Sequence, residues 1–317
     1  MSGQQGADRR GHHAERHHLR SAAVAVLRSV DRQMALREDV EQALAVDVVA
    51  TRRVHGGDVA ASFAVDLADE RRVFAKTHLT APPGFFTTEA ASLSWLRQPG
   101  VVPVPEVLAV SDDPPLLVLE WIDEGRPIDT TERELGRALA ALHRAGAATF
   151  GRSDRRSTGS RGLPNEPCED WATFYATQRI APLVRMAREA NALPERAITG
   201  LHSLDAVRLR AIGGPPEPPA RLHGDLWAGN RLVDKAGRSW FIDPASHGGH
   251  REFDLAMMRL FGGFGEECYA AYAESYPLAD GWEQRVSLHQ IAPLVVHAIK
   301  FGGGYPAAAA DAIARCA

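Results

Sequence analysis

The chain has 317 residues, which is enough for a large hydrophobic core and for two lobes. Thirty-six Lys and Arg against 40 Asp and Glu give a formal charge of −4, so the overall charge gives no reason to expect nucleic acid as the main partner. Three widely spaced cysteines favour a reducing, cytoplasmic location. No signal-peptide pattern is present, and no apolar run approaches the ~20 residues that span a bilayer.

The N-terminal segment, residues 1–20, is polar and rich in Arg and His. Its histidines could bind a metal on a helix, but this composition is more typical of a disordered tail. Residues 21–44 carry apolar side chains at helical spacing, which predicts one or two helices.

A β-sheet follows the first helical segment. The runs 46–54, 60–67 and 72–78 are β-branched or alternating, and they predict an antiparallel meander. The first turn contains Gly56 and Gly57, which would let backbone amides approach a phosphate closely or would only make the turn.

Lys76 lies inside the third apolar run, where burying an unpaired ammonium group is expensive. We predict that Lys76 binds nucleotide phosphates and pairs with Glu89 on the next helix, residues 85–96. The alternative is that Lys76 points to solvent and Glu89 is an ordinary surface acid.

Two further strands are predicted at 106–110 and 116–122. The second is apolar throughout and ends at Glu120, Trp121 and Ile122, where we predict a hinge whose backbone meets the adenine edge. A plain buried strand is the alternative.

The rest of the chain is mainly helical. Helices are predicted from Thr130 to His143 and over 171–190 and 195–212. Between the first two, residues 150–167 form a loop whose four arginines either face the substrate or are only solvated.

The most informative stretch is Leu222–Asn230, followed by Asp243. Asp225 and Asn230 lie five positions apart on one loop, and a hairpin over 231–243 would return Asp243 to Asn230. Mg²⁺ prefers oxygen ligands, so Asn230 and Asp243 are the predicted metal ligands. Asp225 is then placed to face the acceptor hydroxyl, as in the catalytic loop of kinases.

The neighbours of Asp225 have supporting roles. His223 is predicted to be buried and to fix the loop through backbone hydrogen bonds. The Trp227 indole could stack on a sugar ring or pack under the loop. Asp254 is predicted to brace the loop through Arg or backbone amides, or else only to cap a helix.

The segment after Asp243 argues against a protein substrate held as in protein kinases. Pro244 follows Asp243 directly and restricts the backbone, so a flipping switch is not expected. The chain continues into Gly248–Leu255 and a helix, which leaves no room for a long peptide-binding loop. This spacing favours a small acceptor.

The His-Gly-Asp-Leu-Trp stretch with Asn230, the segment 241–257, and the tail 281–305 resemble the fructosamine kinase family, also called ketosamine-3-kinases. The similarity covers roughly residues 33–305. It implies an α+β, two-lobed protein-kinase-like fold, with an N-lobe over 21–122 that holds an antiparallel sheet, and a mostly helical C-lobe over 123–317.

The resemblance also implies an activity: Mg²⁺- and ATP-dependent phosphorylation of the sugar 3-hydroxyl of ketosamines, free or on protein lysines, which leads to deglycation. It assigns Asp225 as proton acceptor and suggests Trp227, His250 and His297 for the sugar side. We expect a cytoplasmic protein without a membrane or nucleic-acid partner. The sequence does not determine the oligomeric state, although it slightly favours a monomer. The sequence departs from some relatives at Asp58-Val59-Ala60, where they carry a cysteine, so we expect no redox switch there.

Two other functions stay open. The chain could be another kinase of the aminoglycoside phosphotransferase type, acting on an aminoglycoside, choline or a sugar. It could also be a nucleotide-binding pseudokinase, although all the predicted catalytic positions are filled.

Overall fold

The computed structural model describes residues 34–54, 60–154, 157–158 and 162–317. The chain forms two compact units. The first runs to Ala81 and includes Leu108–Trp121; the second comprises Pro82–Val107 and Ile122–Ala317. The segment 82–107 therefore groups with the second unit, although it precedes residue 122 in the chain. The predicted tail 1–20, together with Gly56 and Gly57, lies outside the described residues.

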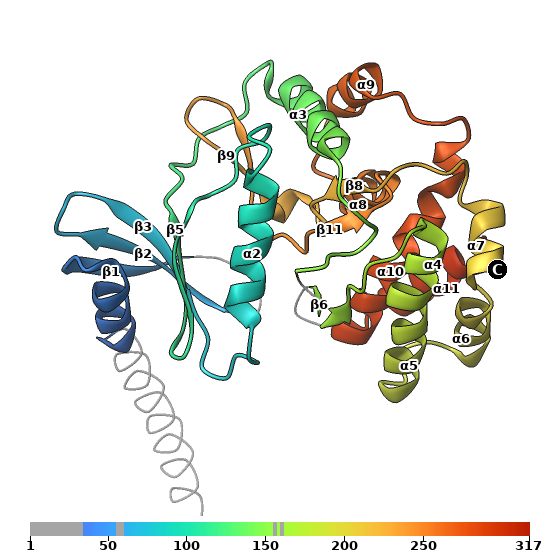
Figure 1. Cartoon of the computed structure of the whole chain (residues 1–317), viewed down its shortest axis with the longest axis horizontal. Helices are drawn as coiled ribbons and strands as arrows, with labels where there is room; N and C mark the ends of the chain where they lie inside the picture. The colour runs from blue at the N-terminus through green and yellow to red at the C-terminus, as the bar shows by residue number, and fades with distance from the viewer. Residues whose placement is uncertain (1–33, 55–59, 155–156, 159–161) are drawn as a thin grey trace, which may run out of the picture. The chain divides into compact units, whose positions relative to one another are not determined.

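The first unit is built on a five-stranded sheet with the order β1-β2-β3-β5-β4 (Figure 1). Neighbouring strands from β1 to β5 along this order pair antiparallel. The strands are β1 Val48–Val54, β2 Ala61–Leu67, β3 Arg72–Thr77, β4 Val107–Asp112 and β5 Pro115–Glu120. The predicted meander and both later strands are confirmed to within a few residues.

A helix over residues 34–44 supplies Leu36 and Val40 to the core of this unit. These side chains pack with every second residue of β2 and β3, because alternate strand residues point to the same face. The strand residues of this core are Val48, Phe63, Val65, Leu67, Val73, Ala75, Leu116 and Val118. Lys76 follows Ala75 in β3 and is opposite Ser62 and Leu117 in register.

The second unit is mainly helical. Its helices are α2 Phe85–Arg97, α3 Thr131–Ala145, α4 Trp171–Tyr175, the π-helical turn η1 Ala176–Ile180, α5 Ala181–Glu189, α6 Glu195–His202, α7 Ala206–Ile212, the 3₁₀ turn η2 Ala228–Asn230, α8 Glu252–Phe261, α9 Glu266–Ser275, α10 Trp282–Phe301 and α11 Tyr305–Ala314. Within the described part of this unit, no helix is long and apolar enough to cross a membrane.

Three two-stranded sheets complete the second unit. They pair β6 Ser157–Thr158 with β7 Leu163–Pro164, β8 Ala220–Leu222 with β11 His247–Gly249, and β9 Arg231–Val233 with β10 Ser239–Phe241. The β9–β10 hairpin confirms the predicted one. The β8–β11 pair joins the segment before Asp225 to the segment after Asp243, so both ends of the predicted site are held by one ladder.

One helix prediction was wrong. Residues 195–212 form two helices rather than one, since α6 ends at His202 and α7 begins at Ala206. Asp205 starts the second helix, since its carboxylate accepts a hydrogen bond from the backbone amide of Arg208 at 2.8 Å. Asp is a preferred residue at the N-cap of a helix, so Asp205 marks the start of a new helix in the sequence.

Candidate active site

The loop between β8 and β9, residues 223–230, carries the predicted catalytic residues, and we call it the catalytic loop. The buried imidazole of His223 organises this loop. Its Nδ1 accepts a hydrogen bond from the Asp225 amide at 3.2 Å, and its Nε2 lies 3.0 Å from the carbonyl oxygen of Ile242. Because a carbonyl can only accept, Nε2 carries the proton of a neutral ring. Burial lowers the His223 pKa, in keeping with this neutral form. His223 therefore links Asp225 to the residue before Asp243, and its predicted structural role is confirmed.

Asp254, at the start of α8, holds the same loop from another side. Its two carboxylate oxygens accept hydrogen bonds from the backbone amides of His223 at 2.7 Å and Gly224 at 2.9 Å. Gly224 has φ 81°, and a side chain there would collide with the Ala245 carbonyl. The predicted bracing of the loop by Asp254 is confirmed, with backbone amides rather than Arg as the partners.

The sequence did not reveal what holds Asp254 itself. His143 Nε2 on α3 lies 3.2 Å from Asp254, and His143 Nδ1 lies 2.8 Å from the hydroxyl of Tyr272 on α9. All three side chains are fully buried or nearly so. His143 must donate to the carboxylate, so in its neutral form it accepts from Tyr272. Only the spacing of apolar residues around His143 hinted at a buried position.

The hairpin brings the two predicted metal ligands together. The Ile242 amide donates to the Asn230 carbonyl at 3.1 Å, and Asn230 Nδ2 lies 3.5 Å from the backbone carbonyl oxygen of Asp243. The same Nδ2 donates to the Asp225 carboxylate at 3.1 Å. Because the amide nitrogen is engaged there, the amide oxygen of Asn230 is the atom suited to a cation. An amide oxygen and a carboxylate are ligands that Mg²⁺ accepts, so these residues fit the ion.

Asp225, the predicted catalytic base, has a pKa raised toward neutral pH. It is half-buried, and burial raises its pKa to about 6, against the lowering effect of the hydrogen bond from Asn230. The charges of Asp243 and Asp254 contribute to this rise. A catalytic base is most effective when its pKa lies near the working pH.

Asp243 adopts φ 51°, a left-handed conformation that few residues other than glycine take. Asp tolerates this conformation better than most, and Pro244 follows it. Strained backbone of this kind concentrates at functional sites. The turn therefore supports a dedicated role for Asp243 at the end of the hairpin.

Trp227 lies two residues after Asp225 and is 41% exposed. Its indole covers Gly229 so closely that a Cβ there would lie 2.2 Å from the ring. Its ring also meets that of Phe261 edge-on, with centroids 6.2 Å apart. Trp227 thus packs on its own loop and still presents part of its surface to solvent.

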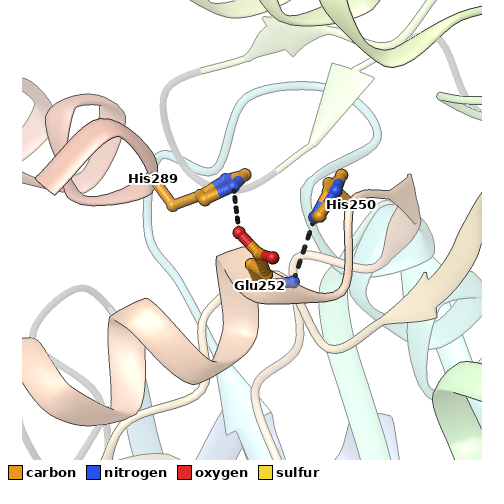
Figure 2. Close-up of side chains that lie close together, drawn as sticks. All are labelled: His250, Glu252 and His289. Carbon is orange, nitrogen blue, oxygen red and sulfur yellow. Dashed lines mark hydrogen bonds and ion pairs between the residues drawn. The ribbon is translucent and has the colours of Figure 1, made fainter. Parts of the chain in front are cut away.

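His250 lies in a buried cluster with Glu252 and His289 (Figure 2). The ligand atoms of these residues lie within 4.8 Å of one another, as in a metal site. However, Arg285 donates to both oxygens of Glu252, at 2.9 and 2.5 Å, and the Glu252 amide donates to His250 Nδ1. A guanidinium in this position opposes a second cation. We therefore interpret the cluster as an ion-pair network that fastens α8 to α10.

His297, on α10, is half-buried, and its ring contacts those of Phe261 and Tyr305. Its Nδ1 lies 2.8 Å from the carbonyl of Pro293, one turn earlier, so this nitrogen carries a proton. The positive charge of Lys300, one turn further along α10, opposes the rise of the Asp225 pKa.

The nucleotide-side predictions are distributed over both units. Lys76 is 4% exposed in the first unit, so it does not point to solvent. Glu89 lies on α2 of the second unit, and their pairing stays a prediction. Glu120 and Trp121 are the last residues of the first unit. Ile122 begins the longer, C-terminal segment of the second unit. Arg72 lies over the Trp121 ring, 5.6 Å from its centroid.

Arg152, one of the four arginines of the predicted loop 150–167, is not simply solvated. Arg152 is 3% exposed, and its guanidinium lies over the Trp95 ring of α2 while it donates to Ser246 at 3.0 Å. Arg221 of β8 also lies over Trp95. These contacts tie α2, which carries Glu89, to the segment that follows Asp243.

A family model described as Fructosamine kinase matches residues 32–317. The chain belongs to the fructosamine kinase family. It is 33% identical over 288 residues to mouse ketosamine-3-kinase, covering 81% of this chain and 92% of the mouse protein. The expected family is confirmed, and membership in a kinase family makes this chain a phosphotransferase that uses ATP.

Solved structures agree on the fold. A crystal structure from Thermobifida fusca, assigned as a fructosamine-3-kinase, has a TM-score of 0.82 and 37% identity, covering 89% of this chain and 98% of that one. The choline kinase LicA of Streptococcus pneumoniae, also solved with AMP, has a TM-score of 0.61 at 15% identity and covers 90% of this chain and 99% of its own. The predicted α+β, protein-kinase-like fold of this chain is confirmed.

Proposed function

We propose that this chain transfers the γ-phosphoryl group of ATP to the 3-hydroxyl of the sugar part of a ketosamine. The observation that supports this most is the shared anchoring of Asp225, Asn230 and Asp243. His223 binds both the Asp225 amide and the Ile242 carbonyl, while Asn230 binds the Asp225 carboxylate. One loop and one hairpin thereby keep a base and two metal ligands together.

In the proposed reaction, the Asp225 carboxylate orients the acceptor hydroxyl and takes its proton. The hydroxyl oxygen forms a bond to the γ-phosphorus, the bond to the β-phosphate oxygen breaks, and ADP leaves. Mg²⁺, when held by Asn230 and Asp243, would neutralise the phosphate charge. Asn230 also keeps the Asp225 carboxylate in place through its 3.1 Å hydrogen bond.

On the nucleotide side, we propose that Lys76 binds phosphate oxygens and that Glu89 orients it. The burial of Lys76 in β3 supports a fixed ammonium, which is suited to positioning a phosphate. Glu120 to Ile122 would meet the adenine, and Gly56 and Gly57 would contribute backbone amides. Each of these roles rests on sequence position and on the family resemblance.

The acceptor could be a free ketosamine or a glycated lysine of a protein. The mouse relative is named a ketosamine-3-kinase, and a phosphorylated ketosamine is unstable, so deglycation would follow from the transfer. The alternative acceptors are those of other kinases with this fold, such as aminoglycosides or choline.

A panel of acceptors tests the proposal. ATP consumption should be measured with ribulosamine, fructosamine, choline and an aminoglycoside, each at the same concentration and with Mg²⁺ present. We expect turnover with the two ketosamines. Turnover only with choline or the aminoglycoside would refute the proposed substrate, and ATP binding without any turnover would favour the pseudokinase.

A further inference from the structure

Five aromatic side chains form a continuous strip in the second unit. They are Trp227 on the catalytic loop, Phe261 at the end of α8, His297 and Phe301 on α10, and Tyr305 at the start of α11. We call these residues the aromatic strip. All five are at least partly exposed, and Phe301 is 48% exposed.

The rings of the strip follow one another at contact distance. Ring centroids are 6.2 Å apart for Trp227–Phe261, 4.9 Å for Phe261–His297 and 5.0 Å for His297–Tyr305. Phe301 contacts both His297 and Tyr305, with centroids at 5.4 and 6.2 Å. Partly exposed rings from four segments of the chain therefore gather into a single apolar surface, and such surfaces commonly bind ligands.

One end of this surface lies at the catalytic base. Trp227 follows Asp225 by two residues on the same loop. The strip therefore begins on the loop that carries Asp225, extends along α10 and stays within one unit of the fold.

The chemistry of a ketosamine indicates what this surface would bind. The amine nitrogen is attached to C1, two carbons from the C3 hydroxyl that the proposed reaction places at Asp225. The group on that nitrogen must therefore leave the sugar close to Asp225. A surface of rings favours apolar and aromatic groups, and it also attracts the protonated amine through the ring faces.

We propose that the aromatic strip binds the organic group carried by the amine nitrogen, and so selects ketosamines with apolar or aromatic amines over those with small ones. This inference rests on the proposed function. Phe301 is a specificity-determining residue, because it lies at the opposite end of the strip from Trp227 and is exposed.

Two acceptors that differ only in the amine test this role. Fructosamines of benzylamine and of methylamine should be compared as substrates of the wild type, Phe301→Ala and Phe301→Tyr. Phe301 is half exposed, so we expect all three proteins to fold. Because burying part of a ring is worth on the order of 1.4 kcal/mol, Phe301→Ala should lower kcat/KM for the benzylamine adduct about tenfold. The methylamine adduct should be affected less than about twofold.

Phe301→Tyr is the matched control because it keeps the ring, and it should behave as the wild type with both adducts. Equal losses with the two adducts in Phe301→Ala, or no loss with the benzylamine adduct, would overturn this inference while leaving the ketosamine kinase activity intact. A wild type that phosphorylates neither adduct would overturn the proposed function and this inference with it.

Discussion

The carboxylate of Asp254 accepts a hydrogen bond from the backbone amide of His223 at 2.7 Å, which joins the start of α8 to the catalytic loop. The second oxygen of Asp254 accepts from the next amide, that of Gly224. A fully buried carboxylate is thus used to hold two consecutive backbone donors. Hydrogen bonds to a charged group are stronger than neutral ones, so the loop beside Asp225 is held rigidly.

Replacing Asp254 by Asn should damage both stability and catalysis. The Asn amide has one acceptor oxygen where the carboxylate has two. Its NH₂ group would therefore face another donor, either a backbone N–H or His143. We expect the free energy of unfolding to fall by about 3 kcal/mol, because a buried donor loses its charged acceptor. The kcat should fall about tenfold or more, because Asp225 is less well positioned.

Urea denaturation and steady-state kinetics measure these two effects. Asp311→Asn is the control, since it makes the same chemical change on the exposed face of α11. An Asp254→Asn variant as stable and active as Asp311→Asn would show that Asp254 does not hold the loop.

The hydroxyl of Tyr272 should matter although it lies three hydrogen bonds away from the loop. Tyr272→Phe removes the partner of His143 Nδ1, which stays buried. We expect a loss of about 2 kcal/mol in unfolding free energy, and a smaller loss of kcat than in Asp254→Asn. Tyr269→Phe removes a hydroxyl from the same helix, so equal stability of the two variants would refute this role.

The Glu252–Arg285 pair predicts a pH effect on stability. Burial would raise the Glu252 pKa, but hydrogen bonds from His289 and Arg285 lower it to about 2. An unfolded Glu titrates near ~4.3, so the pair stabilises the fold fully above that pH. This stabilisation is lost as the pH falls toward 2.

Denaturation at pH 6 and pH 3 tests this effect. The wild type should lose roughly 2 kcal/mol more unfolding free energy between these pH values than Glu252→Gln does. Glu266→Gln, which changes an exposed residue of α9, should keep the wild-type pH dependence. Identical pH dependence in Glu252→Gln and the wild type would contradict the lowered pKa.

Lys76 provides a test of the nucleotide side. Lys76→Met keeps the length of a buried side chain and removes its charge, so the fold should survive. If Lys76 binds phosphate oxygens, kcat/KM for ATP should fall about 10²-fold. Lys235→Met, at an exposed lysine, should have no effect, and normal ATP kinetics in Lys76→Met would exclude the predicted role.

The parts of the fold that were predictable depend on short-range patterns. The β2–β3 meander follows from alternation, and the hairpin from Arg231 to Phe241 follows from two short apolar runs around a turn. The hairpin alone was sufficient to place Asp243 beside Asn230. The spacing of five positions along one loop was likewise sufficient to predict that Asp225 and Asn230 lie close together.

The parts that were not predictable depend on contacts between distant segments. His143 meets Asp254 across 111 positions, and Arg152 meets Ser246 across 94. Neither pairing leaves a periodic signal, because each is a single polar contact formed once the helices pack. The aromatic strip has the same origin, since its rings come from the catalytic loop, α8, α10 and α11.

The position of the phosphate in the reaction product tests the central claim most directly. A fructosamine should be incubated with the enzyme, ATP and Mg²⁺, and the phosphorylated carbon identified by NMR, with Asp225→Asn as the matched variant. We expect a phosphate on the 3-hydroxyl with the wild type and no product with Asp225→Asn, which should still bind ATP. A phosphate at another hydroxyl, or an unchanged yield with Asp225→Asn, would contradict the account.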